Sequence, residues 1–200
     1  PEVVLHLAGQ ASVPRSVLGP RLDLRVNVDG LVNLMETAAR WGVRKVIAMS
    51  SAAVYGTPNQ LPLTEESPTL PLSPYGLSKL MAEQYIRLLG DLRGVAYTIV
   101  RPANIFGPRQ TSEAEGAVVP TFLERFLAGT DPVIHGAGDQ TRDFLFVADM
   151  VEALVRAVDR ADGLTLNVSS GTGVSIRELW TTLAGLLGWS RPPVYGPVRP

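Results

Sequence analysis

The chain has 200 residues, of which 46% are hydrophobic and 18% are charged, and its formal net charge is −1. This composition excludes a disordered chain, because it can bury a sizeable core, and the balanced charge excludes sequence-independent binding to nucleic acid. No apolar run approaches the ~20 residues of a membrane span, and the absence of cysteine excludes disulfides and zinc–thiolate sites. The lack of cysteine is compatible with a reducing cytoplasm.

Hydrophobic periodicity predicts strands that alternate with helices. One helix is expected to end at Gly42, Asp149 is expected to cap another, and Ser175 with Glu178 forms a capping box. The alternation predicts an α/β fold, with a parallel sheet covered by helices on both faces. In chain order the expected elements are strand 3–7, helix 27–41, strand 46–49, loop 56–74, helix 74–89, strand 97–100, helix 118–127, strand 144–147, helix 149–158, strand 164–168 and helix 175–187.

Polar side chains follow two of the predicted strands. Ser50 and Ser51 come directly after strand 46–49, and Asn104 follows strand 97–100. In parallel sheets the ligand crevice lies beyond the carboxyl ends of the strands. Between these segments lie Tyr75 and Lys79, whose four-residue spacing places both on one face of a helix.

This spacing suits general base catalysis by a tyrosine. A phenol titrates near ~10, and lowering its pKa by ~3 units requires about 4 kcal/mol, which one ammonium ~4 Å away supplies at an effective dielectric constant of ~20. With Ser51 positioning an alcohol, Tyr75 could take its proton while hydride leaves the carbon. Two alternatives stay open: the lysine is a solvated residue near a ring, and the serines cap a turn.

Five segments and two further ones carry a family resemblance. In chain order they are His6–Val13, Asn27–Gly30, Ser50–Gly56, Ser73–Lys79 and Arg101–Arg109, followed by Gly138–Phe144 and Asn167–Gly171. On these segments the chain resembles the extended short-chain dehydrogenase/reductase family, in its nucleotide-sugar epimerase/dehydratase branch, over essentially its whole length.

The resemblance implies a Rossmann-type doubly wound parallel sheet, its N-terminal part missing, and a smaller α/β substrate lobe. Residues 1–105 are expected to form the remainder of the NAD-binding Rossmann domain. Residues 106–200 form mostly the substrate lobe, with strand 164–168 returning to the sheet. The family's Gly-x-x-Gly-x-x-Gly turn is absent, so about 60 residues are expected to precede residue 1, and the isolated 200 residues are expected to be inactive.

The resemblance also implies roles for individual residues. Local alternatives are a salt bridge of Arg142 with Asp139 or Asp143, a packing role for His135 and a structural role for Arg101. The implied catalytic residues are Ser51, Tyr75 and Lys79; the cofactor-binding residues are Leu7, Ala8, Gly9, Asn27, Ser50, Tyr75, Lys79 and Pro102; the substrate-binding residues are Ser51, Asn104, Val118, Val133, His135, Arg142 and Arg199; and no metal site is expected.

The implied activity is NAD-dependent epimerisation at C4 of a nucleotide sugar of the UDP-glucose/UDP-galactose type, through a 4-keto intermediate. Ala52 and Ala53 stand where dehydratase relatives carry an acidic pair, which favours epimerisation. The alternatives are a 4,6-dehydratase, a decarboxylase, a 4-keto reductase and a catalytically silent module. A UDP-sugar substrate, a cytoplasmic location and a homodimer through helices 29–40 and 74–89 are expected, with no nucleic-acid or membrane partner.

Overall fold

The computed structural model describes residues 1–57, 60–112 and 117–198. The chain divides into two compact units. The first contains Pro1–Ala103 and Ala148–Val168, and the second contains Asn104–Val147 and Ser169–Pro200. Among the helices of the described ranges, none is both long and apolar enough to cross a bilayer.

The first unit is built on a four-stranded parallel sheet in the order β1-β2-β3-β7. Because all four strands run the same way, their carboxyl ends meet at one edge. The strand expected at 164–168 pairs with β3 and belongs to this sheet. The bounds are β1 (Val3–His6), β2 (Lys45–Met49), β3 (Ala96–Pro102) and β7 (Leu164–Val168).

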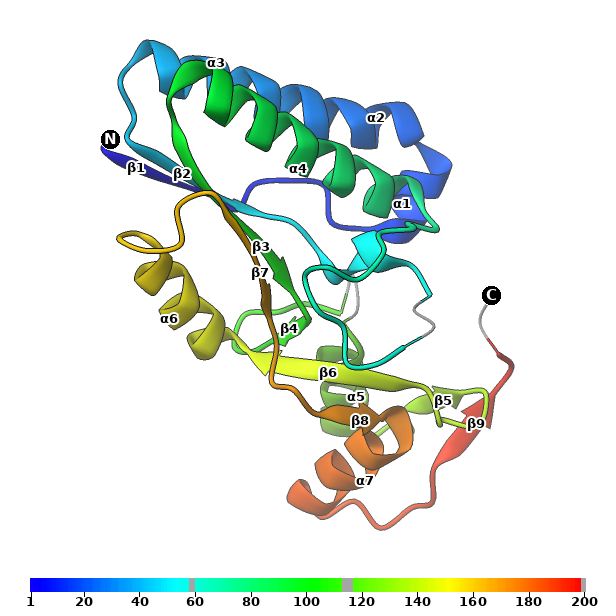
Figure 1. The fold of residues 1–200 in the computed structure, drawn as a ribbon. Coiled ribbons are helices and arrows are strands. Elements are labelled where there is room, and N and C mark those ends of the chain that lie inside the picture. Colours follow the sequence, from blue (N-terminus) through cyan, green and yellow to red (C-terminus); the bar gives the residue numbers. More distant parts are fainter. Residues whose placement is uncertain (58–59, 113–116, 199–200) are drawn as a thin grey trace. The chain divides into compact units, whose positions relative to one another are not determined.

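Helices cover both faces of this sheet, as the alternation of elements predicts (Figure 1). Leu31, Met35 and Ile86 from the helices α3 and α4 pack against the strands with Val46 and Ile99, which are buried. The helical elements of the unit are α1 (Val13–Leu18), α2 (Pro20–Leu24), the π-helical turn η1 (Arg25–Asp29), α3 (Gly30–Arg40), the 3₁₀ turn η2 (Ala52–Tyr55), α4 (Pro74–Arg93) and α6 (Val147–Ala157).

Several helix bounds differ from the sequence expectation. The expected helix 27–41 is preceded by further helical turns, and Pro14 and Pro20 lie in the first turns of α1 and α2, where a proline is tolerated. α4 continues through Gly90 to Arg93 and ends at Gly94, which adopts a left-handed conformation. Glycine at position 90 lets the helix pack closely on β3, because a Cβ there would lie only 2.5 Å from the ring of Tyr97.

The expectation that Asp149 caps a helix is wrong. The strand before it ends at Phe146 and α6 begins at the next residue, Val147, so Asp149 lies inside the first helical turn. The strand runs directly into the helix with no intervening loop. A carboxylate in this turn still interacts favourably with the helix dipole.

The second unit combines two small sheets with two helices. β4 (Asn104–Phe106), β6 (Thr141–Phe146) and β8 (Gly173–Ser175) form one sheet, and β5 (Val133–His135) pairs in parallel with β9 (Val194–Gly196). The expected helices are present as α5 (Val118–Leu127) and α7 (Ile176–Leu186), and the capping box of Ser175 and Glu178 is confirmed. The core of this unit contains Phe122, Phe126, Ile134, Ile176 and Trp180.

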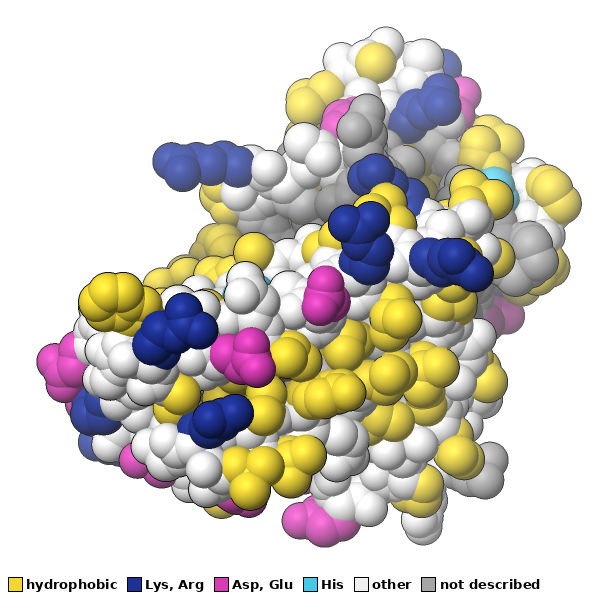
Figure 2. Space-filling view, turned by 90° about the horizontal axis from the view of Figure 1, so that it is seen from above, with side chains coloured by type: hydrophobic (Ala, Val, Ile, Leu, Met, Phe, Trp, Pro, Cys, Tyr) yellow, Lys and Arg dark blue, Asp and Glu magenta, His cyan; other side chains and the backbone are white. Residues whose placement is uncertain are grey.

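Hydrophobic side chains remain exposed on the outer face of the helical layer of the first unit. Figure 2 shows them gathered on the face seen from above in Figure 1. Leu22 and Val26 are four residues apart, and Leu88 lies eleven residues after Leu77 and four before Leu92, so the members of each set lie on one face of a helix. We call this group the apolar helix patch; it contains Leu22, Val26, Leu77, Leu88 and Leu92, which are between 39% and 67% exposed.

A buried lysine at the amino end of β2 joins the sheet to α6. Lys45 is fully buried at the start of β2. Its ammonium donates to the carbonyls of Ala157 and Arg160, at 2.6 and 2.5 Å, and to a carboxylate oxygen of Asp162 at 2.5 Å. All three donors of the ammonium are therefore satisfied, which offsets the cost of burying it.

We expect Lys45→Met in the full-length protein to lower the free energy of unfolding by about 1–3 kcal/mol, because two carbonyls lose a charged donor. Arg156→Met is the control, since Arg156 and its partner Glu152 are exposed, and it should cost less than about 1 kcal/mol. Urea denaturation measures both values. Equal losses for the two variants would contradict the role given to Lys45.

Candidate active site

The N-terminal part of α4 places Tyr75 and Lys79 close together. Ser73 caps the helix by accepting a hydrogen bond from the Gly76 amide at 3.1 Å, and Pro74 occupies the first turn. One turn apart, Tyr75 and Lys79 share a face as predicted, with the ammonium 6.0 Å from the centroid of the ring. Tyr75 is buried and Lys79 is half-buried, so the lysine is not merely a solvated residue near a ring.

Gly76 allows α4 to approach the turn that follows β2. A Cβ on Gly76 would lie 2.6 Å from the carbonyl oxygen of Ala53, so any side chain here would push the two segments apart. Ser51 caps that turn, and its hydroxyl accepts from the Ala53 amide at 3.1 Å. The capping role is therefore real, and the bond leaves the O–H of Ser51 able to donate to another group.

The ammonium of Lys79 lies at the carboxyl end of the sheet. It donates to the carbonyl of Met49, the last residue of β2, at 2.9 Å. Burial lowers the pKa of Lys79, and the carboxylate of Asp23 opposes this shift. The pKa of His6 is also lowered, by burial and then by the charge of Lys79. A small pocket is lined by His6, Ala8, Asn27, Met49, Ser50 and Lys79, among others.

Asn27 organises the segment that follows β1. Its amide oxygen accepts from the Gln10 backbone at 2.9 Å, and its amide nitrogen donates to the Gln10 carbonyl at 3.0 Å and to the Ser78 hydroxyl at 3.1 Å. Gln10 in turn donates to buried Asp23 at 2.6 Å. The sequence analysis missed Gln10, Asp23 and Ser78 as members of the site, although Gln10 and Ser78 lie inside the segments that carry the resemblance.

Gly9 lies within this organised segment. A Cβ there would be 3.0 Å from the Asn27 side-chain oxygen and 3.3 Å from the Lys79 ammonium, so glycine allows these two polar groups to approach the backbone closely. Its neighbours Leu7 and Ala8 are exposed, and Pro102 is buried at the end of β3.

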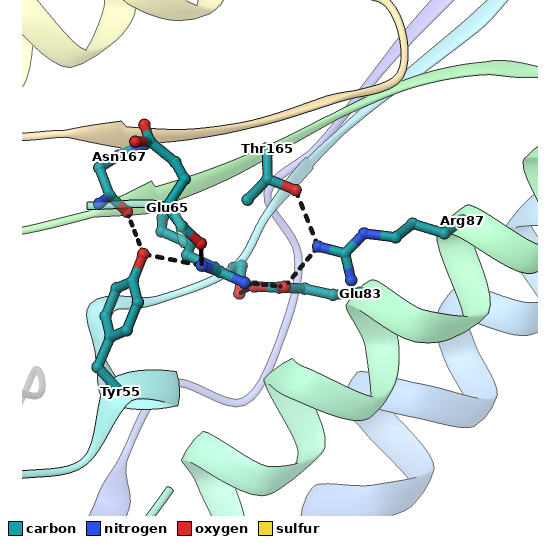
Figure 3. Close-up of polar contacts among 8 residues, drawn as sticks. Tyr55, Glu65, Glu83, Arg87, Thr165 and Asn167 are labelled. Carbon is teal, nitrogen blue, oxygen red and sulfur yellow. Dashed lines mark hydrogen bonds and ion pairs between the residues drawn. The ribbon is translucent and has the colours of Figure 1, made fainter. Parts of the chain in front are cut away.

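Ser50 faces away from solvent and binds a buried carboxylate. Its hydroxyl donates to Glu83 at 2.6 Å. Arg101 binds the same carboxylate with two parallel hydrogen bonds, at 2.8 and 2.7 Å, which is the structural role expected for this arginine. Burial raises the pKa of Glu83, but hydrogen bonds from Arg101 and Ser50 and the charges of Arg101 and Arg87 outweigh it, and the pKa is lowered overall. Figure 3 shows this network.

Apart from Ser51, which lies in the first unit, the residues expected to bind substrate lie in the second unit. Asn104 begins β4, opposite Phe144 of β6, and Val118 begins α5. Val133 and His135 both lie on β5, and a ring nitrogen of His135 is 3.1 Å from the Pro197 carbonyl oxygen. Arg199 lies outside the described residues.

Arg142 is exposed on β6, and its guanidinium donates to the Thr141 carbonyl at 2.8 Å. The alternative of a salt bridge with Asp139 or Asp143 is not seen in the described part of the chain. Asp139 pairs with Arg177 at 2.7 Å, and Asp143 accepts from the backbone amides of residues 170 and 171. Most of the guanidinium donors of Arg142 thus remain available for a ligand.

Within the described ranges, no three or more His, Cys, Asp or Glu side chains gather in a way that could hold a metal ion. At the carboxyl edge of its sheet, the first unit carries the phenol of Tyr75, the ammonium of Lys79 and the hydroxyl of Ser51. This set can move a proton to or from an alcohol.

Comparison with known proteins places these features in context. The sequence model of the NAD-dependent epimerase/dehydratase family matches residues 1–169. A UDP-glucose 4-epimerase of Mycolicibacterium smegmatis is 45% identical over 201 residues, which are 100% of this chain and 64% of that protein. The chain thus spans just under two thirds of the length of this relative.

Several solved structures that align with this chain contain bound ligands. The UDP-glucose 4-epimerase of Thermotoga maritima, with UDP-glucose, aligns at a TM-score of 0.96 and 37% identity, covering 100% of this chain and 65% of that one. A dTDP-glucose 4,6-dehydratase of Streptomyces venezuelae, with NAD and TYD bound, aligns at 0.90 and 28% identity, covering 99% and 61%. The predicted Rossmann-type α/β class is confirmed by these alignments.

Proposed function

Because the chain belongs to the NAD-dependent epimerase/dehydratase family, we propose that its full-length protein epimerises a nucleotide sugar at C4. The observation that carries this proposal is the shared face of Tyr75 and Lys79 on α4, beside the turn that Ser51 caps. The similarity to named epimerases makes the protein a member of an enzyme family, and the isomerase class fits.

The described residues fit the nicotinamide and ribose end of NAD. Lys79 uses one ammonium donor on the Met49 carbonyl, which leaves two for the ribose and the phenol. Gly9 lets the backbone after β1 lie close to both Asn27 and Lys79, because a Cβ there would be only 3.0 Å from the Asn27 side-chain oxygen. A glycine-rich turn for the pyrophosphate is not among these 200 residues. NAD, when bound, would supply the redox chemistry of the reaction as an acceptor and donor of the hydride at C4 of the sugar.

Tyr75 carries the proton in the proposed mechanism. Its phenolate takes the proton from the 4-hydroxyl of the sugar, and the Lys79 ammonium stabilises that phenolate electrostatically. Ser51 donates or accepts a hydrogen bond at the same oxygen and so orients it. When the 4-keto sugar is reduced again from its other face, Tyr75 returns the proton, and the net change is inversion at C4.

Two alanines support epimerisation over elimination. Ala52 and Ala53 form the first half of η2, directly after Ser51, and neither can donate or accept a proton through its side chain. Removing water from a sugar needs an acid at the leaving hydroxyl, whereas inversion at C4 needs none. A product assay on the full-length protein distinguishes epimerisation from dehydratase, decarboxylase and reductase activity.

We propose a UDP-sugar as substrate, in line with the named relatives. The exposed guanidinium of Arg142 is suited to phosphate oxygens because it offers paired donors and keeps its charge. Asn104 can add an amide donor. A cytoplasmic location belongs to the same proposal.

The proposed reaction predicts that the full-length protein interconverts UDP-glucose and UDP-galactose when each is supplied separately. Tyr75→Phe should lower kcat by about 10²-fold or more, because the proton carrier is lost. Tyr85→Phe is the control, since Tyr85 is exposed on the same helix, and it should retain activity. Chromatography of the products measures both. Accumulation of a 4-keto sugar would instead indicate a dehydratase, and unchanged turnover in Tyr75→Phe would refute the mechanism.

A homodimer through the apolar helix patch is also proposed. An exposed apolar surface on packed helices is typical of an interface, and the expected dimer helices overlap α3 and α4, the second of which contributes to the patch.

Leu88→Asp should therefore convert a dimer of the full-length protein into a monomer in analytical ultracentrifugation, because a carboxylate would be buried without a partner. Leu127→Asp on α5 is the control, since Leu127 is equally apolar, lies outside the patch and is 77% exposed. A wild-type monomer, or a Leu88→Asp dimer, would contradict the proposal.

A further inference from the structure

α4 carries a third polar residue on the face of the proposed catalytic pair. Tyr75, Lys79 and Glu83 follow one another at intervals of four residues, one helical turn each. Glu83 is only 1% exposed, and the proposed mechanism gives it no task. A buried carboxylate is costly unless it is paired, so its place beside the site requires an explanation.

The backbone that leads to Ser51 is anchored by this face of α4. The Lys79 ammonium binds the carbonyl of Met49 at 2.9 Å, and Glu83 accepts from the Ser50 hydroxyl at 2.6 Å. The amide of Ser50 also donates to the Val100 carbonyl of β3 at 2.7 Å. The two residues before Ser51 are thus fixed to both the helix and the neighbouring strand.

The other end of this segment, at Tyr55, is linked to the Glu83 carboxylate through Arg101. Arg101 binds Glu83 through two hydrogen bonds and donates to the Tyr55 hydroxyl at 2.8 Å. Tyr55 is the last residue of η2, and its hydroxyl donates to Asn167 at 2.7 Å. Figure 3 shows Asn167 bound to the Tyr55 hydroxyl, and Arg87 reaching Glu83 from α4.

From this arrangement we propose that Glu83 and Arg101 are positioning residues that fix Ser51 relative to Tyr75 by binding the segment 50–55 at both of its ends. The inference rests on the proposed function, because it gives Ser51 and Tyr75 their catalytic meaning. The resemblance implies that Ser50 contacts the cofactor, but in this structure its hydroxyl donates a hydrogen bond to Glu83. The orientation of Ser51 depends on a carboxylate that two arginines keep ionised and in place.

Ser50→Ala in the full-length protein tests this positioning role. Losing the bond to Glu83 should lower kcat by about tenfold or more, since small misplacements of reacting groups are costly, while KM for the nucleotide sugar changes less than about twofold. Ser50→Thr, which restores a hydroxyl, should recover most of the rate. Thr165→Val is the matched control: it removes a hydroxyl bonded to Arg87 at 2.8 Å, on the side of the network away from Ser51, and should leave kcat within about twofold.

A second measurement does not depend on turnover. Amide hydrogen exchange across residues 50–55 should be faster in Ser50→Ala and in Tyr55→Phe than in the wild type, and unchanged in Thr165→Val, because only the first two variants loosen the segment. Wild-type exchange in both variants, or a wild-type kcat in Ser50→Ala, would overturn the inference. If no nucleotide sugar is converted by the wild type, the proposed function fails, and the exchange data still decide whether the network positions the segment.

Discussion

The close approach of α4 to the carboxyl end of β2 is the constraint on which the site depends. It requires Gly76, since a Cβ at that position would collide with the Ala53 carbonyl. It is reinforced by the Lys79 ammonium, which binds the last carbonyl of β2. Tyr75 directly precedes Gly76, and Ser51 lies two residues before Ala53. The close approach of the two backbones therefore brings both side chains to the same edge of the sheet.

This packing buries charged groups, and the structure pairs Lys79 and Glu83 with groups of opposite charge. Lys79 lies in an environment that lowers its pKa, with the carboxylate of Asp23 favouring its charged form. Glu83 is paired with Arg101 and Arg87, and the pKa of Arg101 is raised, because the hydrogen bonds and charges of Glu83 and Tyr55 outweigh the opposing effect of burial. Such groups stabilise a fold weakly compared with apolar packing, but they hold a geometry closely. The arrangement is consistent with a site that must align a phenol, a hydroxyl and a substrate oxygen.

Local patterns in the sequence were sufficient for the sheet, for the long helices and for the Tyr75–Lys79 face. They could not reveal the three-residue strands β4, β5, β8 and β9, which are too short to show a period. The expected helix 74–89 stopped short of Gly90, whose close contact with the ring of Tyr97 on another element is not visible in the sequence. The Glu83 network was invisible for the same reason. Its members come from α4, β3, η2 and β7, and the Tyr55–Asn167 bond joins residues 112 apart.

The central claim is that the ammonium of Lys79 makes the Tyr75 phenol a usable base. The pH dependence of kcat/KM for the full-length wild type and for Lys79→Met tests it most directly, provided that NAD occupancy is matched between the two. Activity should rise with pH as the phenolate forms, and the midpoint of this rise should lie about 1–3 units higher in Lys79→Met, where the stabilising charge is gone. An unshifted midpoint would show that the phenol does not depend on the lysine and would contradict the account.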